Sequence, residues 1–280
     1  MKKIRHHRRR NYLNAGKKDP DIKPAGKNMR KKSFTELKNK PIELIRLNKY
    51  IANSGLCSRR EADEFIKQGL VTVNGKVVPE LGTKVSEKDV IKFKGKLLMK
   101  ERKVYVLLNK PKDYITTTGD PYAKKIVFDL LKYACKERIY PVGRLDRMTT
   151  GVLLLTNDGD LTKKLTHPKF NKKKIYHISL DKNLKKTDMV KITEGIDFED
   201  GFISADAIAY VDPNDKKQIG LEIHSGRNRI IRRVFEHLGY RIVKLDRVYF
   251  AGLTKKGLQR GKWRYLTEKE IVMLKTGRYE

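Results

Sequence analysis

A helix signal followed at once by a hairpin signal constrains residues 58 to 78 more than any other stretch of the chain. Ser58-Arg59-Arg60-Glu61 has the residue types of a capping box, which satisfies backbone N–H groups where a helix begins. Apolar residues then recur at helical spacing, at Ala62, Phe65, Ile66 and Leu70. Val71 to Val78 alternates β-branched residues around Asn74-Gly75, which predicts a hairpin with a type I′ turn.

Shorter signals on either side extend this helix and hairpin into a module. Leu47 to Ala52 has the apolar-polar pattern of a short helix, and Asp89 to Phe93 has the pattern of a further strand. We therefore expect residues 43–102 to fold as one small domain.

Strand patterns dominate residues 103–275. The apolar or alternating runs that predict strands are Val104–Leu108, Gly151–Thr156, Ile175–Leu180, Ile203–Val211 and Gln218–His224. One helix is predicted over Arg227–Leu238, with an apolar stripe and Gly239 as its C-cap. Strands and helices do not alternate regularly, so the pattern predicts an α+β fold with a mostly antiparallel sheet.

The charge balance indicates a polyanionic partner. The chain has 65 Lys and Arg against 33 Asp and Glu, a formal net charge of +32. Residues 1 to 40 contain 15 of the basic residues and 3 of the acidic ones. Such a segment buries too little apolar surface to fold, so residues 1–42 are predicted to be a disordered basic tail that binds RNA non-specifically.

Membrane, secreted and metal-binding classes fit less well. No apolar run approaches the ~18 residues of a spanning helix, and the basic N-terminus has no apolar signal segment. Cys57 and Cys135 are far apart, with no zinc-type spacing. We expect a cytoplasmic protein without a metal site and without a membrane partner.

A carboxylate between two glycines is the leading candidate for chemistry. In Gly143-Arg144-Leu145-Asp146-Arg147-Met148-Thr149-Thr150-Gly151, Asp146 is flanked by arginines and precedes an apolar strand. Neighbouring cations favour its ionised form. These residues alone leave four roles open for Asp146: nucleophile, general base, metal ligand, or the partner of an arginine in a turn. Other aspartates near turns or charges are assigned no chemistry, namely Asp120, Asp129, Asp158, Asp160 and Asp246.

The first module resembles an S4 domain, a small RNA-binding unit of ribosomal protein S4 and of several RNA-modifying enzymes. The resemblance is carried by IRLNKYIANSGLCSRREADEFIKQGLVTVNGKVV. It implies that the helices and the hairpin present side chains to RNA. The candidates in this chain are Arg46, Lys49, Ser58, Arg59, Arg60, Lys67, Asn74 and Lys76.

The segment YPVGRLDRMTTGVLLLTNDGDLTKKLTHP is similar to the signature of the RsuA/RluB/RluF family of pseudouridine synthases. The resemblance extends from the S4 module to about Leu274. It implies a catalytic domain with a mixed, mainly antiparallel sheet in two subdomains and an active site in the cleft between them. The stretch 257–264 favours the large-subunit, RluB-like branch.

The same resemblance implies roles for individual residues. Asp146 would be the nucleophile, Tyr176 would stack on the target base, and Arg232 would pair with Asp146. Arg144 would hold the flipped nucleotide, and Arg227 and Asn228 at the helix start would contact phosphate. We expect Arg229 and Arg233 to lie on a solvated face. Two positions depart from the family pattern: Thr150 stands where serine is common, and Ile230 where many relatives have glutamine.

The implied reaction is the isomerisation of a uridine in ribosomal RNA, with base flipping and no cofactor. We expect a monomer that binds ribosomal RNA or a ribosomal subunit precursor. A non-enzymatic S4-type ribosome-binding or assembly factor is the alternative, because it would retain the charge and the RNA partner without the chemistry. A basic DNA-binding protein fits less well, since the sequence has no helix-turn-helix or zinc-finger pattern.

Overall fold

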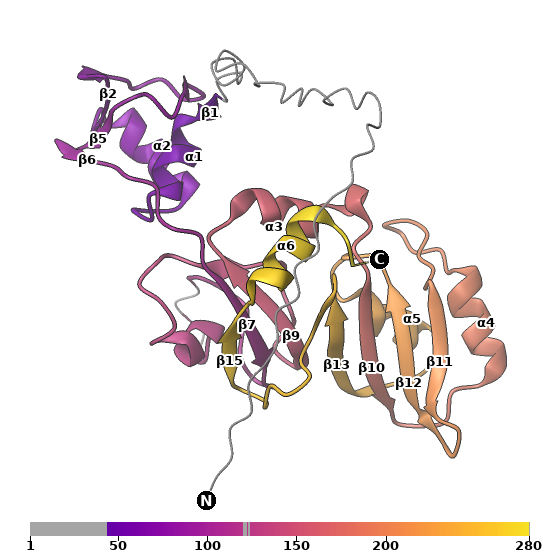
Figure 1. Cartoon of the computed structure of the whole chain (residues 1–280). Helices are drawn as coiled ribbons and strands as arrows, with labels where there is room; N and C mark the ends of the chain where they lie inside the picture. Colours follow the sequence, from indigo (N-terminus) through magenta and orange to yellow (C-terminus); the bar gives the residue numbers. More distant parts are fainter. Residues whose placement is uncertain (1–43, 120–121, 123, 280) are drawn as a thin grey trace, which may run out of the picture. The chain divides into compact units, whose positions relative to one another are not determined.

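The computed structural model describes residues 44–119, 122 and 124–279 (Figure 1). The predicted disordered tail, residues 1–42, lies outside the described residues. The fold is α+β: a small domain, which corresponds to the predicted S4 domain, is followed by a larger domain on a mixed sheet, which corresponds to the predicted catalytic domain.

The S4 domain consists of two short helices and two small sheets around one apolar core. Its central sheet has the strand order β3-β2-β5-β6, and β1 pairs with β4. The core includes Leu47, Ile51, Ala62, Ile66 and Ile91. The elements are β1 Ile45–Arg46, α1 Leu47–Asn53, α2 Arg59–Lys67, β2 Val71–Val73, β3 Lys76–Val77, β4 Lys84–Val85, β5 Ile91–Phe93 and β6 Lys96–Leu97.

The local predictions for this domain are confirmed. The Ser58 hydroxyl accepts a hydrogen bond from the Glu61 N–H at 3.2 Å, and the Glu61 carboxylate accepts one from the Ser58 N–H at 2.6 Å. Asn74 and Gly75 both have positive φ, at 52° and 85°, as a type I′ turn requires. Each feature depends on neighbours close in sequence, which is why the sequence sufficed to predict it.

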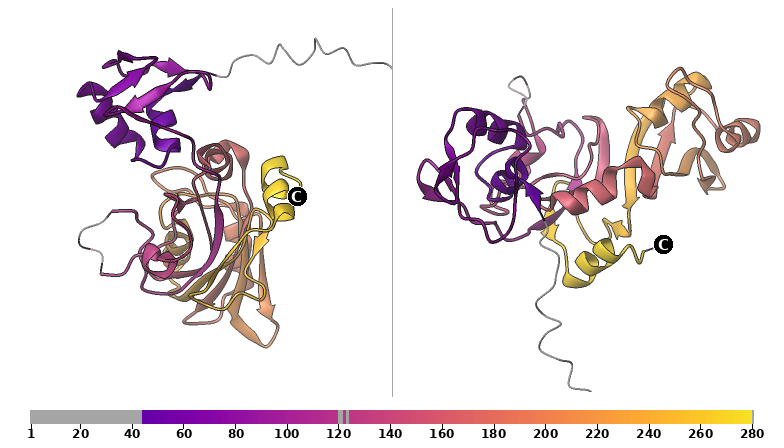
Figure 2. Two further views of the ribbon diagram at one scale, coloured as in Figure 1. Left: turned by 60° about the vertical axis from the view of Figure 1, so that its left-hand side comes forward. Right: turned by 90° about the horizontal axis from the view of Figure 1, so that it is seen from above.

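The catalytic domain is organised around a nine-stranded sheet, most of whose strands pair antiparallel. Its main path has the order β11-β12-β10-β13-β9-β7-β15, and the strands can be followed in Figures 1 and 2. The strands are β7 Tyr105–Lys110, β8 Tyr140–Pro141, β9 Thr149–Thr156, β10 Lys174–Leu180, β11 Ala207–Asp212, β12 Asp215–Ile223, β13 Ile242–Phe250, β14 Leu253–Thr254 and β15 Trp263–Tyr265.

A parallel pairing of β9 with β13 joins the two halves of this sheet. Gly151 lies opposite Arg247 at this junction, and a Cβ built on Gly151 would stand 2.1 Å from the Arg247 carbonyl oxygen. Only glycine permits so close an approach of the two backbones. Gly151, the last residue of the Asp146 motif, therefore lies at the junction between the two halves of the sheet.

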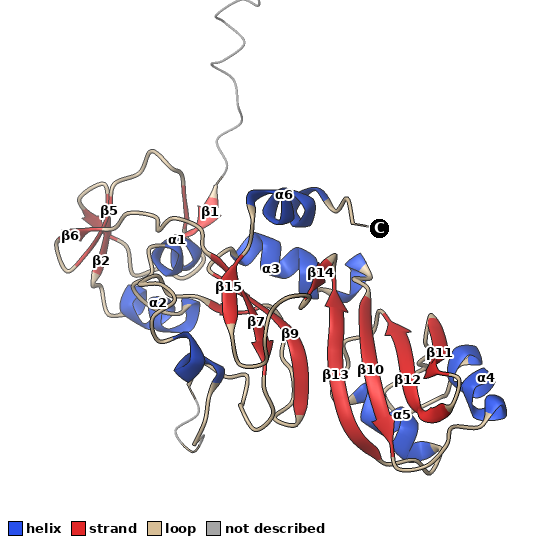
Figure 3. Ribbon diagram, turned by 60° about the horizontal axis from the view of Figure 1, so that its bottom comes forward, coloured by secondary structure: helices blue, strands red, loops and turns tan. Residues whose placement is uncertain are grey.

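Helices cover the sheet and bury separate apolar clusters. α5 Ile230–His237 and α4 Lys186–Glu194 contribute to the cluster over β10 and β12, and α5 lies against these strands in Figure 3. α3 Gly159–Thr166 and α6 Glu268–Thr276 contribute to a cluster over β7 and β9. Two 3-10 helices, η1 Val127–Leu131 and η2 Pro168–Phe170, complete the domain.

Several predicted boundaries are corrected. The helix predicted over Arg227–Leu238 begins at Ile230, because Arg229 takes the left-handed conformation with φ 47°. The strand predicted from Ile203 begins at Ala207, and Ile203 instead forms an isolated bridge with Ile196. The helices α3, α4 and α6 were not predicted. In α3, Asp158 is the N-cap and accepts from the Leu161 N–H at 3.1 Å, so the polar segment after β9 starts a helix.

Candidate active site

A cavity of about 500 Å³ lies where the two halves of the sheet meet. Four stretches of chain line most of it: residues 142–149, the start of β10, the segment that leads into α5, and β13. Six of the residues predicted to act in or near the active site meet there: Asp146, Tyr176, Arg232, Arg144, Arg227 and Asn228. The predicted constellation is thus brought together from positions up to 88 residues apart.

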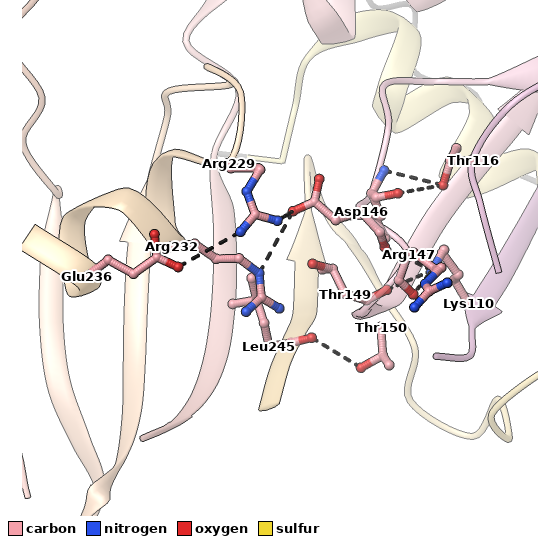
Figure 4. A network of polar contacts seen from close by, with 11 residues as sticks. Lys110, Thr116, Asp146, Arg147, Thr149, Thr150, Arg229, Arg232, Glu236 and Leu245 are labelled. Carbon is pink, nitrogen blue, oxygen red and sulfur yellow. Dashed lines mark hydrogen bonds and ion pairs between the residues drawn. The ribbon is translucent and has the colours of Figure 1, made fainter. Parts of the chain in front are cut away.

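Asp146 precedes β9, and its carboxylate faces two arginines of the opposite wall. Its Oδ2 lies 3.9 Å from Arg229 Nη1 and 4.0 Å from Arg232 Nε (Figure 4). The side chain remains 39% exposed, so a ligand in the cavity can reach it. A carboxylate that faces cations at this distance without a tight hydrogen bond is suited to attack or to charge stabilisation.

The Asp146 loop is held from behind by Lys110, the last residue of β7. Its ammonium donates to the carbonyl oxygens of Pro111, Asp146, Arg147 and Thr149 at 2.9–3.2 Å. Thr116 adds a second tie, since its hydroxyl donates to the Leu145 carbonyl at 2.8 Å. Burial lowers the pKa of Lys110 to about 8, and Asp146 and Asp113 oppose that shift. The carboxylate therefore rests on a loop whose backbone is fixed.

Arg232 and Arg229 approach Asp146 from different surroundings. The Arg232 side chain is 12% exposed, and its burial, together with nearby Arg229, lowers its pKa. The Arg229 side chain is 50% exposed and also lies 3.9 Å from Glu236. Because water screens an exposed pair, the electrostatic contribution of Arg232 at Asp146 exceeds that of Arg229.

Tyr176 lies on β10 in the wall of the cavity, and it is 8% exposed. The paired strand β13 places Arg247 opposite it in register. The Arg247 guanidinium is buried, donates from Nε to the Val152 carbonyl at 2.9 Å, and stacks 4.6 Å from the Phe250 ring. Its burial lowers its pKa. Tyr176 and the buried Arg247 therefore lie side by side on paired strands in the cavity wall.

The charge of the cavity is strongly positive. Among the lining residues that the structure describes, Asp146 is the one carboxylate, beside Lys174 and six arginines: Arg144, Arg147, Arg227, Arg229, Arg232 and Arg247. A concave, cationic site of this size suits a nucleotide with its flanking phosphates.

Three predictions near α5 are corrected. Arg227 and Asn228 lie in the turn before the helix and not in its first turn, because α5 starts at Ile230. Arg227 Nη1 donates to the Gly201 carbonyl at 2.7 Å. Arg229 is exposed, as predicted, and its guanidinium also faces Asp146. Arg233 is not simply solvated, because it forms a bidentate pair with Asp200 at 2.6 and 2.9 Å. That pair lowers the pKa of Asp200 to about 2.

The residues predicted to bind RNA in the S4 domain are not among those that line this cavity; they belong to α1, α2, the β2–β3 hairpin and their flanks. Arg46, Arg59, Arg60 and Lys76 are exposed, and Lys49 is half-buried. Three others already hold the fold: Ser58 caps α2, Lys67 pairs with Glu64 at 3.0 Å, and Asn74 binds Asp89 and the Val90 N–H. The Asn74 side chain is thereby committed to its own turn.

Sequence reasoning missed three basic residues that shape the cavity: Lys110, Lys174 and Arg247. Two sequence signals were present. Lys110 ends an apolar strand directly before Pro111, and Lys174 stands two residues before Tyr176, on the same face of a strand. Arg247 carried no such signal, because its position depends on the pairing of β13 with β10.

Within the described ranges, no three His, Cys, Asp or Glu side chains are grouped so that they could hold a metal ion. None of the helices in the described part of the chain has the length and apolar character needed to cross a bilayer.

Comparison with known proteins places these features in a family. Residues 104–237 match the family model for RNA pseudouridylate synthases, and residues 45–91 match that for the S4 domain. Ribosomal large subunit pseudouridine synthase B of Bacillus subtilis (strain 168) is 43% identical over 233 residues, which cover 82% of this chain and 95% of the relative. The dual-specificity RNA pseudouridine synthase RluF of Escherichia coli K12 is 35% identical, over 84% of this chain and 79% of that protein.

A solved structure gives the same result. The crystal structure of a pseudouridylate synthase superimposes with a TM-score of 0.60 at 28% identity, covering 82% of this chain and 99% of that one.

Proposed function

The chain belongs to the RsuA/RluB/RluF family of ribosomal RNA pseudouridine synthases, and we propose that it isomerises a uridine of large-subunit ribosomal RNA with Asp146 as its nucleophile. The observation that carries the proposal is the cavity in which Asp146, Tyr176 and Arg232 meet. Their joint presence favours an enzyme over an assembly factor, which would need no such site.

The reaction requires no net redox change. The N1–C1′ bond of uridine breaks, the uracil turns, and C5 bonds to C1′; C5 loses a proton and N1 gains one. Because no electrons enter or leave overall, we propose that the chain needs no cofactor.

Asp146 acts on C1′ of the flipped nucleotide. Its carboxylate is accessible, and the guanidinium groups of Arg232 and Arg229 lie about 4 Å from it. Negative charge is thereby held beside the carbon from which uracil departs. The Lys110 contacts to the loop carbonyls keep this carboxylate from swinging away during the rotation of the base.

Tyr176 stacks on the target base and limits its motion while it is detached. The buried Arg247 lies opposite Tyr176 on the paired strand β13. Arg144 and Asn228 are exposed at the cavity and contact the phosphates or the gap that the flipped base leaves. Flipping costs a few kcal/mol, and it costs least in an RNA loop. Contacts of the S4 domain with RNA offset this cost.

The large-subunit assignment rests on the likeness to the Bacillus subtilis enzyme and on the stretch 257–264. β15 begins at Trp263 within that stretch and pairs with β7. We propose further that the protein acts as a monomer in the cytoplasm, on ribosomal RNA or a ribosomal subunit precursor. The basic tail would add a non-specific RNA anchor.

Tritium release from ribosomal RNA labelled at uridine C5 tests this function. Wild-type protein should release tritium from a large-subunit transcript, whereas the Asp146→Asn variant should release none. Release only from small-subunit RNA would contradict the large-subunit assignment. Absence of release from both RNAs, with RNA binding retained, would favour the assembly factor.

A further inference from the structure

The first residue of β10, Lys174, reaches across the end of its strand to the segment that leads into α5. Its ammonium donates to the carbonyl oxygens of His224 at 2.6 Å, Lys172 at 3.1 Å and Ser225 at 3.4 Å. Two of these acceptors belong to residues 224–229, which connect β12 to α5. These hydrogen bonds, called the Lys174 tie below, link His224 and Ser225 at the start of that connection to β10, the strand that carries Tyr176.

The number of donors matches the number of acceptors. A lysine ammonium has three N–H donors and no acceptor, and Lys174 directs all three at backbone oxygens. The connection that it holds has no regular secondary structure and ends in left-handed Arg229, a conformation that costs about 1 kcal/mol or more outside glycine. A segment of this kind keeps one conformation only where tertiary contacts fix it.

Fixing this connection determines where two arginines point. Arg229 ends the connection, Arg232 lies in the first turn of α5, and both face the Asp146 carboxylate. We propose that Lys174 is a positioning residue, whose ammonium holds residues 224–229 so that Arg229 and Arg232 face Asp146. The proposal rests on the proposed function for its catalytic consequence, but the tie itself can be measured without activity.

The charges around Lys174 make this tie dependent on pH. Burial and, to a lesser extent, nearby Arg247 lower the pKa of Lys174 to about 8, while Asp206 opposes the shift. The His224 ring is 2.6 Å from Asp206, so that carboxylate is shared. Deprotonation leaves two N–H donors and a lone pair that faces a carbonyl oxygen, so the tie weakens above about pH 8.

The contribution of Lys174 to the free energy of unfolding increases as pH rises, whereas the tie weakens. The folded-state pKa lies below the value of about 10.5 for an unfolded lysine. Between these two values the unfolded chain binds the extra proton, so this group makes unfolding less favourable as pH rises. If the catalytic rate falls between these two pH values, the titration of Lys174 does not cause that fall by unfolding the protein.

Three variants test the proposal. Lys174→Met removes all three donors, Lys174→Arg keeps a permanent charge, and Lys244→Met changes an exposed lysine on the neighbouring strand β13. Amide hydrogen exchange of residues 224–232 reports the tie directly. We expect faster exchange there in Lys174→Met, with unchanged exchange in the S4 domain, and wild-type exchange in Lys244→Met. Unchanged exchange in Lys174→Met would overturn the proposal whether or not the protein is a pseudouridine synthase.

Kinetics test the catalytic consequence. Misplacing a reacting group by about 1 Å can cost roughly 100-fold, so Lys174→Met should lower kcat by about 10- to 100-fold with a smaller change in KM. The wild-type rate should decline above about pH 8, and Lys174→Arg should decline less steeply because its guanidinium stays charged. An equally steep decline in Lys174→Arg, with folding intact by circular dichroism, would overturn the pH-dependent role.

Discussion

The S4 domain and the catalytic cavity both present basic side chains to RNA, but they hold them in different surroundings. Arg46, Arg60 and Lys76 of the S4 domain are exposed on short local elements. In the cavity wall, Arg247 is buried and Arg232 is nearly so. Water and salt screen the first group, whereas the second group acts in a less polar environment. We propose from this comparison that one region supplies affinity and the other supplies chemistry.

The sharpest test of this division is Asp146→Asn. The amide retains the shape of the side chain but loses the negative charge, so kcat should fall by about 10⁴-fold or more. RNA affinity, measured by filter binding, should stay within a few-fold of wild type. Asp197→Asn, an exposed change outside the cavity, is the matched control and should keep full activity. Loss of RNA binding or folding in Asp146→Asn would assign Asp146 a structural role.

A second comparison separates the two arginines that face Asp146. Removing one preorganised charge at a reacting centre costs about 10²–10³ in kcat, and we expect Arg232→Met to show a loss of this size. Arg229→Met should lose about tenfold or less, because its side chain is 50% exposed. Single-turnover rates at saturating RNA measure both. Equal losses in the two variants would show that burial does not distinguish them.

Removal of exposed cations of the S4 domain should lower RNA affinity without lowering kcat. The double variant Arg60→Ala/Lys76→Ala should weaken RNA binding severalfold at low salt and leave kcat at saturating RNA unchanged. The slope of the logarithm of the binding constant against the logarithm of salt concentration should become less steep by roughly 1.4–1.8. Each lost phosphate contact removes about 0.7–0.9 from that slope. Titrations at several salt concentrations measure that slope. A changed kcat with an unchanged slope would break the division between affinity and chemistry.

The smallest expected effect concerns stability alone. Ser58→Ala removes the N-cap of α2, which should cost about 1 kcal/mol of S4-domain stability. Thermal unfolding followed by circular dichroism measures the loss, and Ser58→Thr should restore most of it. A large drop in RNA affinity, with stability unchanged, would instead make Ser58 the RNA contact that its sequence position first suggested.

The sequence predicted the S4 domain more fully than it predicted the cavity. The capping box at Ser58 and the turn at Asn74 depend on partners within a few residues, so local pattern was sufficient. The same reasoning placed the start of α5 three residues too early, because helical spacing does not reveal that Arg229 is left-handed. It also predicted a solvated face for Arg233, whose partner Asp200 lies 33 residues away.

Within the cavity, the sequence reached Asp146 through its motif, and the family resemblance added Tyr176 and Arg232. Neither could identify Lys110, Lys174 or Arg247 as structural supports of that site. Each of these side chains is defined by the backbone oxygens or rings that surround it, and those belong to other strands and connections.

By itself, the sequence determined which residues form local elements, the excess of positive charge, and the reactive types in the Asp146 motif. Tertiary structure alone decided which cations lie near Asp146, which are buried, and which hold the loops in place. The physical reason is range: a cap or a turn is decided by neighbours in the chain, whereas burial and ion pairing are decided by neighbours in space. Pairing β9 with β13 through Gly151 brings those distant neighbours together.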